Sequence, residues 1–72
     1  MIILGIDPGY AIVGYGVIKH ENNRFFTLAY GAIQTPAGLP YADRLLKIGE
    51  ETGEIIRTYK PDVLSVEDLF FT

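Results

Sequence analysis

The segment from residue 40 to residue 59 constrains the fold more than any other part of the chain. Its apolar residues recur every three or four positions, which is the spacing of one face of an amphipathic helix. These residues are Ala42, Leu45, Ile48, Thr52, Ile55 and Tyr59, with Leu46 and Ile56 widening the stripe. The residues expected on the solvent side are Asp43, Lys47, Glu50, Glu51, Glu54 and Arg57. Pro40 suits the first turn of this helix and Pro61 ends it.

Three strands joined by short turns precede the helix. Residues 2–6, IILGI, form a continuous apolar run, which is typical of a strand buried on both faces. Residues 13–19 and the aromatic-rich residues 24–34 follow as further strands. The polar or turn-forming segments DPGY (7–10) and HENN (20–23) separate them. Short connections of this kind predict an antiparallel meander.

One more strand, residues 62–68 (DVLSVED), follows the helix. A helix between two strands of one sheet implies a right-handed crossover that leaves those strands parallel. The most buried earlier strand, residues 2–6, is the natural partner. We therefore expect an α/β fold whose sheet has the strand order third, second, first, fourth.

Composition limits the size and surroundings of this domain. Seventy-two residues form one small domain, and the absence of cysteine excludes disulfides and thiolate metal sites. A net charge of −3 taken alone disfavours strong nucleic-acid binding. No apolar run can span a membrane and no signal peptide is evident, so we expect a soluble, cytoplasmic protein. One helix covers only one face of the sheet, which favours a fragment of a longer domain that can also dimerise.

Two acids follow two of the predicted strands. Asp7 comes directly after the first buried strand and Glu67 lies at the end of the last one. Because parallel strands share their carboxyl end, the two carboxylates are expected side by side, where they repel each other unless a cation lies between them. Magnesium with oxygen ligands fits, and a pair of such ions about 4 Å apart supports phosphodiester hydrolysis. The alternatives are that Asp7 is an ordinary turn aspartate in Asp-Pro-Gly and that Glu67-Asp68 is a solvated strand end. The expected proximity of the Asp7 and Glu67 carboxylates favours a metal site over both.

The remaining aromatic and histidine residues carry weaker signals. We expect Phe25, Phe26 and Tyr30 to serve the core and the sheet surface rather than a base-stacking platform. His20 is expected to be exposed in a polar turn. Phe70 has two interpretations, as a core residue of a missing half or as a stacking partner for an unpaired base near the acids.

Three short motifs resemble one family. GIDPG at 5–9, GYGVI at 14–18 and SVEDLFF at 65–71 are similar to the N-terminal half of the RuvC family of Holliday-junction resolvases. The resemblance implies an RNase H-like fold and cleavage of four-way DNA junctions by a homodimer in recombination and repair, together with a branch-migration helicase complex. It also implies magnesium, with manganese as a substitute. At matching positions it makes Asp7 and Glu67 catalytic, metal-binding carboxylates, and places Phe70 near the junction DNA.

The same resemblance predicts that the site is incomplete. These resolvases use four acids, and the second pair comes from a later helix that is absent here. We therefore expect residues 1–72 to be the N-terminal part of a single nuclease domain, inactive alone. Two alternatives stay open. An actin-like ATPase or sugar kinase begins similarly, but residues 8–16, PGYAIVGYG, are apolar and contain no Ser or Thr to donate to phosphates in such a hairpin. The second alternative is a non-catalytic binding module with an RNase H-like fold.

Overall fold

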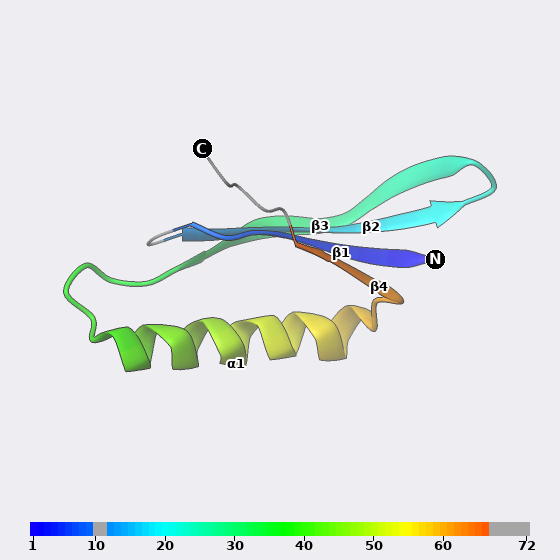
Figure 1. The fold of residues 1–72 in the computed structure, drawn as a ribbon. Helices are drawn as coiled ribbons and strands as arrows, with labels where there is room; N and C mark the ends of the chain where they lie inside the picture. Colours follow the sequence, from blue (N-terminus) through cyan, green and yellow to red (C-terminus); the bar gives the residue numbers. More distant parts are fainter. Residues whose placement is uncertain (10–11, 67–72) are drawn as a thin grey trace.

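The structure, a computed structural model, describes residues 1–9 and 12–66. In these ranges a four-stranded sheet is covered on one face by a single helix (Figure 1). The elements are β1 (Ile2–Asp7), β2 (Ile12–Glu21), β3 (Arg24–Gln34), α1 (Tyr41–Tyr59) and β4 (Val63–Val66). The helix begins directly after Pro40 and ends at Tyr59, and the next residue, Lys60, caps it in the left-handed conformation that commonly terminates helices.

The predicted topology is confirmed. The strand order is β3-β2-β1-β4, with β1 antiparallel to β2, β2 antiparallel to β3, and β1 parallel to β4. Two hydrogen bonds between Ile2 and Asp62 hold the start of the parallel pair. The Ile2 amide donates to Asp62 Oδ2 at 2.7 Å, and the Asp62 amide donates to the Ile2 carbonyl at 2.7 Å. Asp62 therefore sets the register in which β4 runs beside β1.

The turn between β2 and β3 is tighter than the sequence predicted. His20 and Glu21, expected in the turn, belong to β2 and pair with Phe25 and Arg24. Only two residues, Asn22 and Asn23, connect the strands, with φ of 53° and 61°. Two successive positive φ angles are the signature of a type I′ turn, whose twist matches that of the flanking strands. The paired part of the hairpin is thus longer than a four-residue turn would allow, because His20 and Glu21 pair with β3.

The core is small and lies on the helix side of the sheet. Its buried apolar side chains are Leu4, Val13, Val17 and Ile33. Leu4 and Val17 are opposite each other in the β1–β2 register, and Val13 is opposite Ile33 in the β2–β3 register. Ile48, Thr52, Ile55 and Tyr59 of the predicted stripe are half-buried against this layer. No residue of α1 is fully buried, so the helix covers the sheet only in part.

The rotation of α1 differs from the prediction. Lys47 and Glu51, assigned to the solvent side, are half-buried, and Lys47 Nζ donates to the Gln34 carbonyl of β3 at 2.7 Å. Leu45, Leu46 and Ile56 of the predicted apolar stripe are instead exposed, by 52%, 61% and 42%. The apolar residues occupy about half of the helix circumference, and hydrophobic spacing alone does not say which part of so wide an arc meets the sheet.

Candidate functional site at the carboxyl end of strand β1

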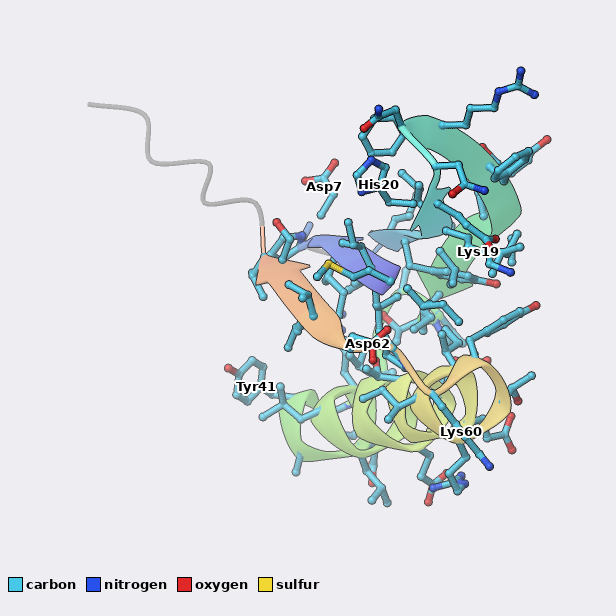
Figure 2. All side chains as sticks on the ribbon, turned by 90° about the vertical axis from the view of Figure 1, so that its right-hand side faces the viewer. Asp7, Lys19, His20, Tyr41, Lys60 and Asp62 are labelled. Atoms are coloured by element: carbon cyan, nitrogen blue, oxygen red, sulfur yellow. The ribbon has the colours of Figure 1, made fainter. Side chains whose placement is uncertain are left out.

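Asp7 lies where the sequence predicted it, as the last residue of β1. It pairs with Gly14 of β2, and its side chain is exposed. Figure 2 shows Asp7 on the side of the sheet away from α1. A buried strand therefore ends in a solvent-accessible carboxylate on the open face of the sheet.

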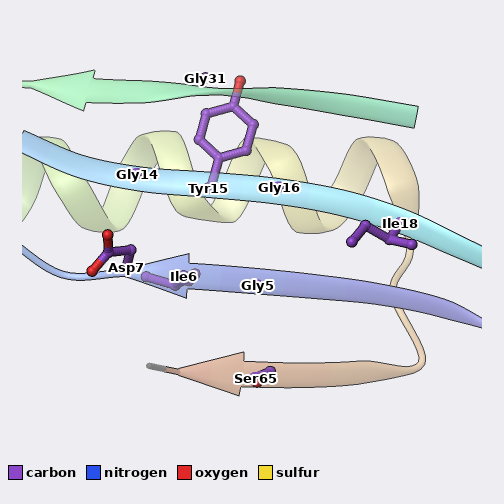
Figure 3. A pocket seen from close by; sticks show the side chains of 9 residues that line it. All are labelled: Gly5, Ile6, Asp7, Gly14, Tyr15, Gly16, Ile18, Gly31 and Ser65. Carbon is purple, nitrogen blue, oxygen red and sulfur yellow. The ribbon is translucent and has the colours of Figure 1, made fainter. Parts of the chain in front are cut away.

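A hollow of about 500 Å³ lies beside this carboxylate (Figure 3). Its lining comes from all four strands, and Asp7 is the only charged residue in it. The residues are Gly5, Ile6, Asp7, Gly14, Tyr15, Gly16, Ile18, Gly31 and Ser65. Beside Asp7 the lining positions Gly5, Gly14 and Gly16 are glycines, so the floor there is backbone without side chains.

Three glycines on neighbouring positions make that floor. Gly5 is opposite Gly16, and Gly14 is opposite Asp7. A Cβ at Gly16 would meet nothing within 4 Å, and one at Gly5 or Gly14 would meet only ordinary contacts at 3.8 Å and 3.7 Å. Glycine weakens a strand, and no contact in the described ranges requires it here. A glycine-floored strand pair is typical of a place where a ligand or another backbone approaches closely.

Gly31 has a different reason to be glycine. A Cβ there would lie 2.9 Å from Tyr15 Oη, closer than real Cβ contacts, and 3.1 Å from Tyr15 Cε1, tighter than most of them. The Tyr15 ring therefore packs over the Gly31 backbone. Tyr15 also lines the space between the sheet and α1, together with Ile33 and Ile55. This glycine serves packing within the chain, whereas Gly16 does not.

Strand β4 runs beside β1 up to the edge that carries Asp7. Gly5 pairs with Ser65 and Ile6 with Val66. Glu67 and Phe70, the other predicted site residues, lie outside the residues that the structure describes. Within residues 1–9 and 12–66, no three His, Asp or Glu side chains lie close enough to hold a metal ion. The described part of the site therefore supplies one carboxylate, an oxygen donor of the kind that magnesium prefers.

Phe25, Phe26 and Tyr30 were expected to serve the core and the sheet surface; the core part of this expectation is wrong, and the sheet-surface part is confirmed. All three lie on the sheet surface, exposed by 69%, 46% and 81%. His20 is also not simply an exposed turn residue, because it is half-buried and its ring stacks on Phe25 with centroids 4.5 Å apart. The helix α1 covers only part of the sheet, and β3 is an edge strand, so these side chains keep contact with solvent.

Comparisons with known proteins agree with this architecture. Residues 3–72 match the family described as crossover junction endodeoxyribonuclease RuvC. The RuvC proteins of Ruminiclostridium cellulolyticum and Alkaliphilus oremlandii are 52% and 55% identical over 71 residues, which are 99% of this chain and 43% of each relative. The structure of T. thermophilus RuvC in complex with Holliday junction substrate superposes with a TM-score of 0.90 at 27% identity, over 100% of this chain and 46% of that one.

The sheet order, the crossover helix and the acid at the end of β1 define the opening half of an RNase H-like domain. The chain belongs to the RuvC family. It spans less than half the length of the curated relatives that it matches. The family assignment sets aside the ATPase and sugar-kinase alternative. No helix in the described part of the chain is long and apolar enough to cross a membrane.

Proposed function

We propose that residues 1–72 are the N-terminal part of a single RNase H-like nuclease domain that cleaves four-way DNA junctions by phosphodiester hydrolysis. The proposal is supported by the family match over residues 3–72 and by the likeness to a RuvC structure in complex with Holliday junction substrate. Homodimer formation, a role in recombination and repair, and assembly with a branch-migration helicase complex belong to the same proposal. They rest on the family resemblance.

The observation that carries the proposed site is the register of the two parallel strands. Ile6 pairs with Val66, Asp7 follows Ile6, and Glu67 follows Val66 in the sequence. Two carboxylates at matching positions of neighbouring parallel strands repel each other unless a cation neutralises them. We therefore assign Asp7 and Glu67 as metal-binding, catalytic carboxylates.

Magnesium is the proposed ion, and manganese is expected to substitute for it. Asp7 fits this role because it is an exposed carboxylate, and hard divalent cations prefer such ligands. The bound metal would supply activation of a water nucleophile and stabilisation of the leaving oxygen. Asp7 holds its oxygens at the strand end, and the glycine floor keeps space open beside them. Phe70 is proposed to contact the junction DNA, because it matches the aromatic residue that follows the glutamate in the family resemblance.

A chimera tests this function directly. The corresponding 71 residues of the R. cellulolyticum relative are replaced by this chain, and magnesium-dependent cleavage of a four-way junction is measured. The chimera should cleave, and Asp7→Asn and Glu67→Gln should each abolish cleavage. Asp43→Asn, at an exposed acid on α1, is the matched control and should leave the rate unchanged.

The isolated chain supplies the second arm of the test. With only two of the four acids it should bind metal weakly and cleave no junction. Junction cleavage by the purified 72-residue chain would contradict the proposed division of the site. A chimera that stays active with Asp7→Asn would instead assign this chain a non-catalytic role.

A further inference from the structure

Ser65 is a polar side chain of the hollow beside Asp7 that the proposed metal chemistry does not use. It lies on β4 opposite Gly5 of β1 (Figure 3), two positions before Glu67 in the sequence. Paired residues of neighbouring strands share a face, and so do alternate residues of one strand. Ser65 therefore lies on the same open face as Asp7, where it is exposed and lines the hollow.

The hydroxyl of Ser65 has no task in the described part of the chain. Within residues 1–9 and 12–66 it makes no hydrogen bond. Its neighbour in the β1–β4 register is Gly5, which has no side chain to contact it. A serine hydroxyl can donate one hydrogen bond and accept two. This capacity is available to a ligand that enters the hollow.

The sheet geometry keeps Ser65 away from a metal ion held by Asp7. Gly5 and Asp7 are two residues apart on β1, and Ser65 lies one strand across from Gly5, so the Cα atoms of Ser65 and Asp7 are about 8 Å apart. Both side chains stand roughly perpendicular to the sheet, so their oxygens are also well separated. Two ligands of one magnesium ion lie within about 4.2 Å of each other, because each is about 2.1 Å from the ion. Ser65 is therefore not a ligand of the ion that Asp7 would bind.

The proposed metal determines where the substrate lies. A scissile phosphate oxygen that binds an ion held by Asp7 lies within about 4.2 Å of that carboxylate, by the same ligand distances. The DNA backbone that continues from this phosphate can cross the floor of Gly5, Gly14 and Gly16, because no side chain stands in its way there. Ser65 borders this course as a neutral donor. Serine hydroxyls are common donors to phosphate oxygens, and the charge of the phosphate strengthens such a hydrogen bond.

We propose that the Ser65 hydroxyl donates a hydrogen bond to a non-bridging oxygen of the phosphate next to the scissile one, on the strand that is cleaved. Ser65 is then a substrate-binding residue that sets the position of the scissile phosphate relative to Asp7. The carboxylates repel phosphates, whereas a hydroxyl binds one without neutralising the carboxylates that the metal needs. The inference rests on the proposed function, because it requires a DNA substrate held by a metal at Asp7.

Substitutions in the junction-cleaving chimera test the contact. Ser65→Ala should lower kcat/KM about 10- to 100-fold, the effect of losing one hydrogen bond to a charged group. Ser65→Thr keeps the hydroxyl and should retain most of the activity. Thr58→Ala is the matched control, because it removes an exposed hydroxyl from α1, on the other side of the sheet, and should leave kcat/KM unchanged.

Modified junctions identify the phosphate. A methylphosphonate replaces one non-bridging oxygen by a methyl group, and it is placed in turn at each of the two phosphates that flank the scissile one. At one of these positions the chimera should cleave more slowly, and Ser65→Ala should cause no further loss on that substrate. Losses that simply add at both positions would show that Ser65 contacts neither phosphate.

Other outcomes would also overturn the role of Ser65. A full cleavage rate in Ser65→Ala would do so, as would an equal loss in Ser65→Thr. In the 72-residue chain, Ser65→Ala should leave the manganese-dependent NMR broadening at Asp7 unchanged, so loss of that signal would show that Ser65 acts through the metal. A chimera that cleaves no junction would remove the proposed function together with this inference, whereas an active chimera with a fully active Ser65→Ala variant would remove this inference alone.

Discussion

Replacing Gly16 with alanine should stabilise the chain. A Cβ at this position meets nothing within 4 Å, so no contact in the described ranges opposes it. Gly16 also has no left-handed φ, and alanine can adopt its conformation. Removing the excess backbone freedom of glycine from the unfolded chain should raise the free energy of unfolding by about 0.5–1 kcal/mol.

Gly31 provides the matched control, because it lies in the neighbouring strand and its Cβ would collide with the Tyr15 ring at 2.9–3.1 Å. Gly31→Ala should lower the free energy of unfolding by about 1–3 kcal/mol, the usual range for overpacking. Adding Tyr15→Ala should remove most of that difference. Urea unfolding followed by far-UV circular dichroism measures all of these variants, and an unchanged m-value shows that stability alone has changed.

The reasoning would be refuted if Gly16→Ala lost stability with an unchanged m-value. The same variant also reports on function. In the chimera, Gly16→Ala should cleave junctions more slowly despite its higher stability, because the new methyl group occupies the hollow beside Asp7. A stable variant with a full cleavage rate would mean that nothing approaches this floor during the reaction.

Two further substitutions test the packing that positions the site. Asp62→Ala removes the acceptor of the Ile2 amide and should lower the free energy of unfolding by about 1–2 kcal/mol, measured by urea unfolding. Asp62→Asn keeps an acceptor oxygen and should lose less stability. Equal losses in the two variants would contradict a role for this hydrogen bond. Leu4→Ala empties a site that is only 1% exposed and should cost about 2–5 kcal/mol. Leu64→Ala, at a side chain 54% exposed, should cost far less, and a similar loss of Tm would place the core elsewhere.

The topology was predictable because few arrangements satisfy the sequence. A helix between the meander and the last strand leaves the parallel pairing of β1 and β4 as the natural solution once the most buried strand is known. The position of Asp7 followed from the same step, since it directly follows that strand. The pairing of Asp7 with Glu67 stays a prediction, because Glu67 lies outside the described residues.

The incorrect predictions concern which side chains are buried, because hydrophobic spacing does not determine which face of an element is covered. Lys47 and Glu51 looked solvent-facing, but both are half-buried, and Lys47 donates to the Gln34 carbonyl of β3. Phe25 and Tyr30 were expected to serve the core as well as the sheet surface, yet both are largely exposed in the described ranges. Exposure of a strand residue depends on which face the single helix covers, and that is a tertiary property.

The glycine floor was missed although its residues stand in the sequence. Gly5, Gly14 and Gly16 belong to two of the family-like motifs, but only the register shows that Gly5 and Gly16 are opposite each other and that Gly14 is opposite Asp7. The register of a hairpin depends on the geometry of its turn, which the sequence motif alone does not specify. The available signal was the repeated glycine spacing in GYG beside a strand that ends in an acid.

The central claim is that Asp7 and Glu67 together bind a divalent cation, and a manganese titration followed by amide NMR tests it most directly. The account predicts selective paramagnetic broadening centred on these two residues, lost in Asp7→Asn and retained in Asp43→Asn. A parallel sample with ATP and magnesium should show no shifts along residues 8–16. Broadening spread evenly over the surface acids, or ATP-dependent shifts in that hairpin, would contradict the paired-carboxylate site and leave Asp7 as a turn residue.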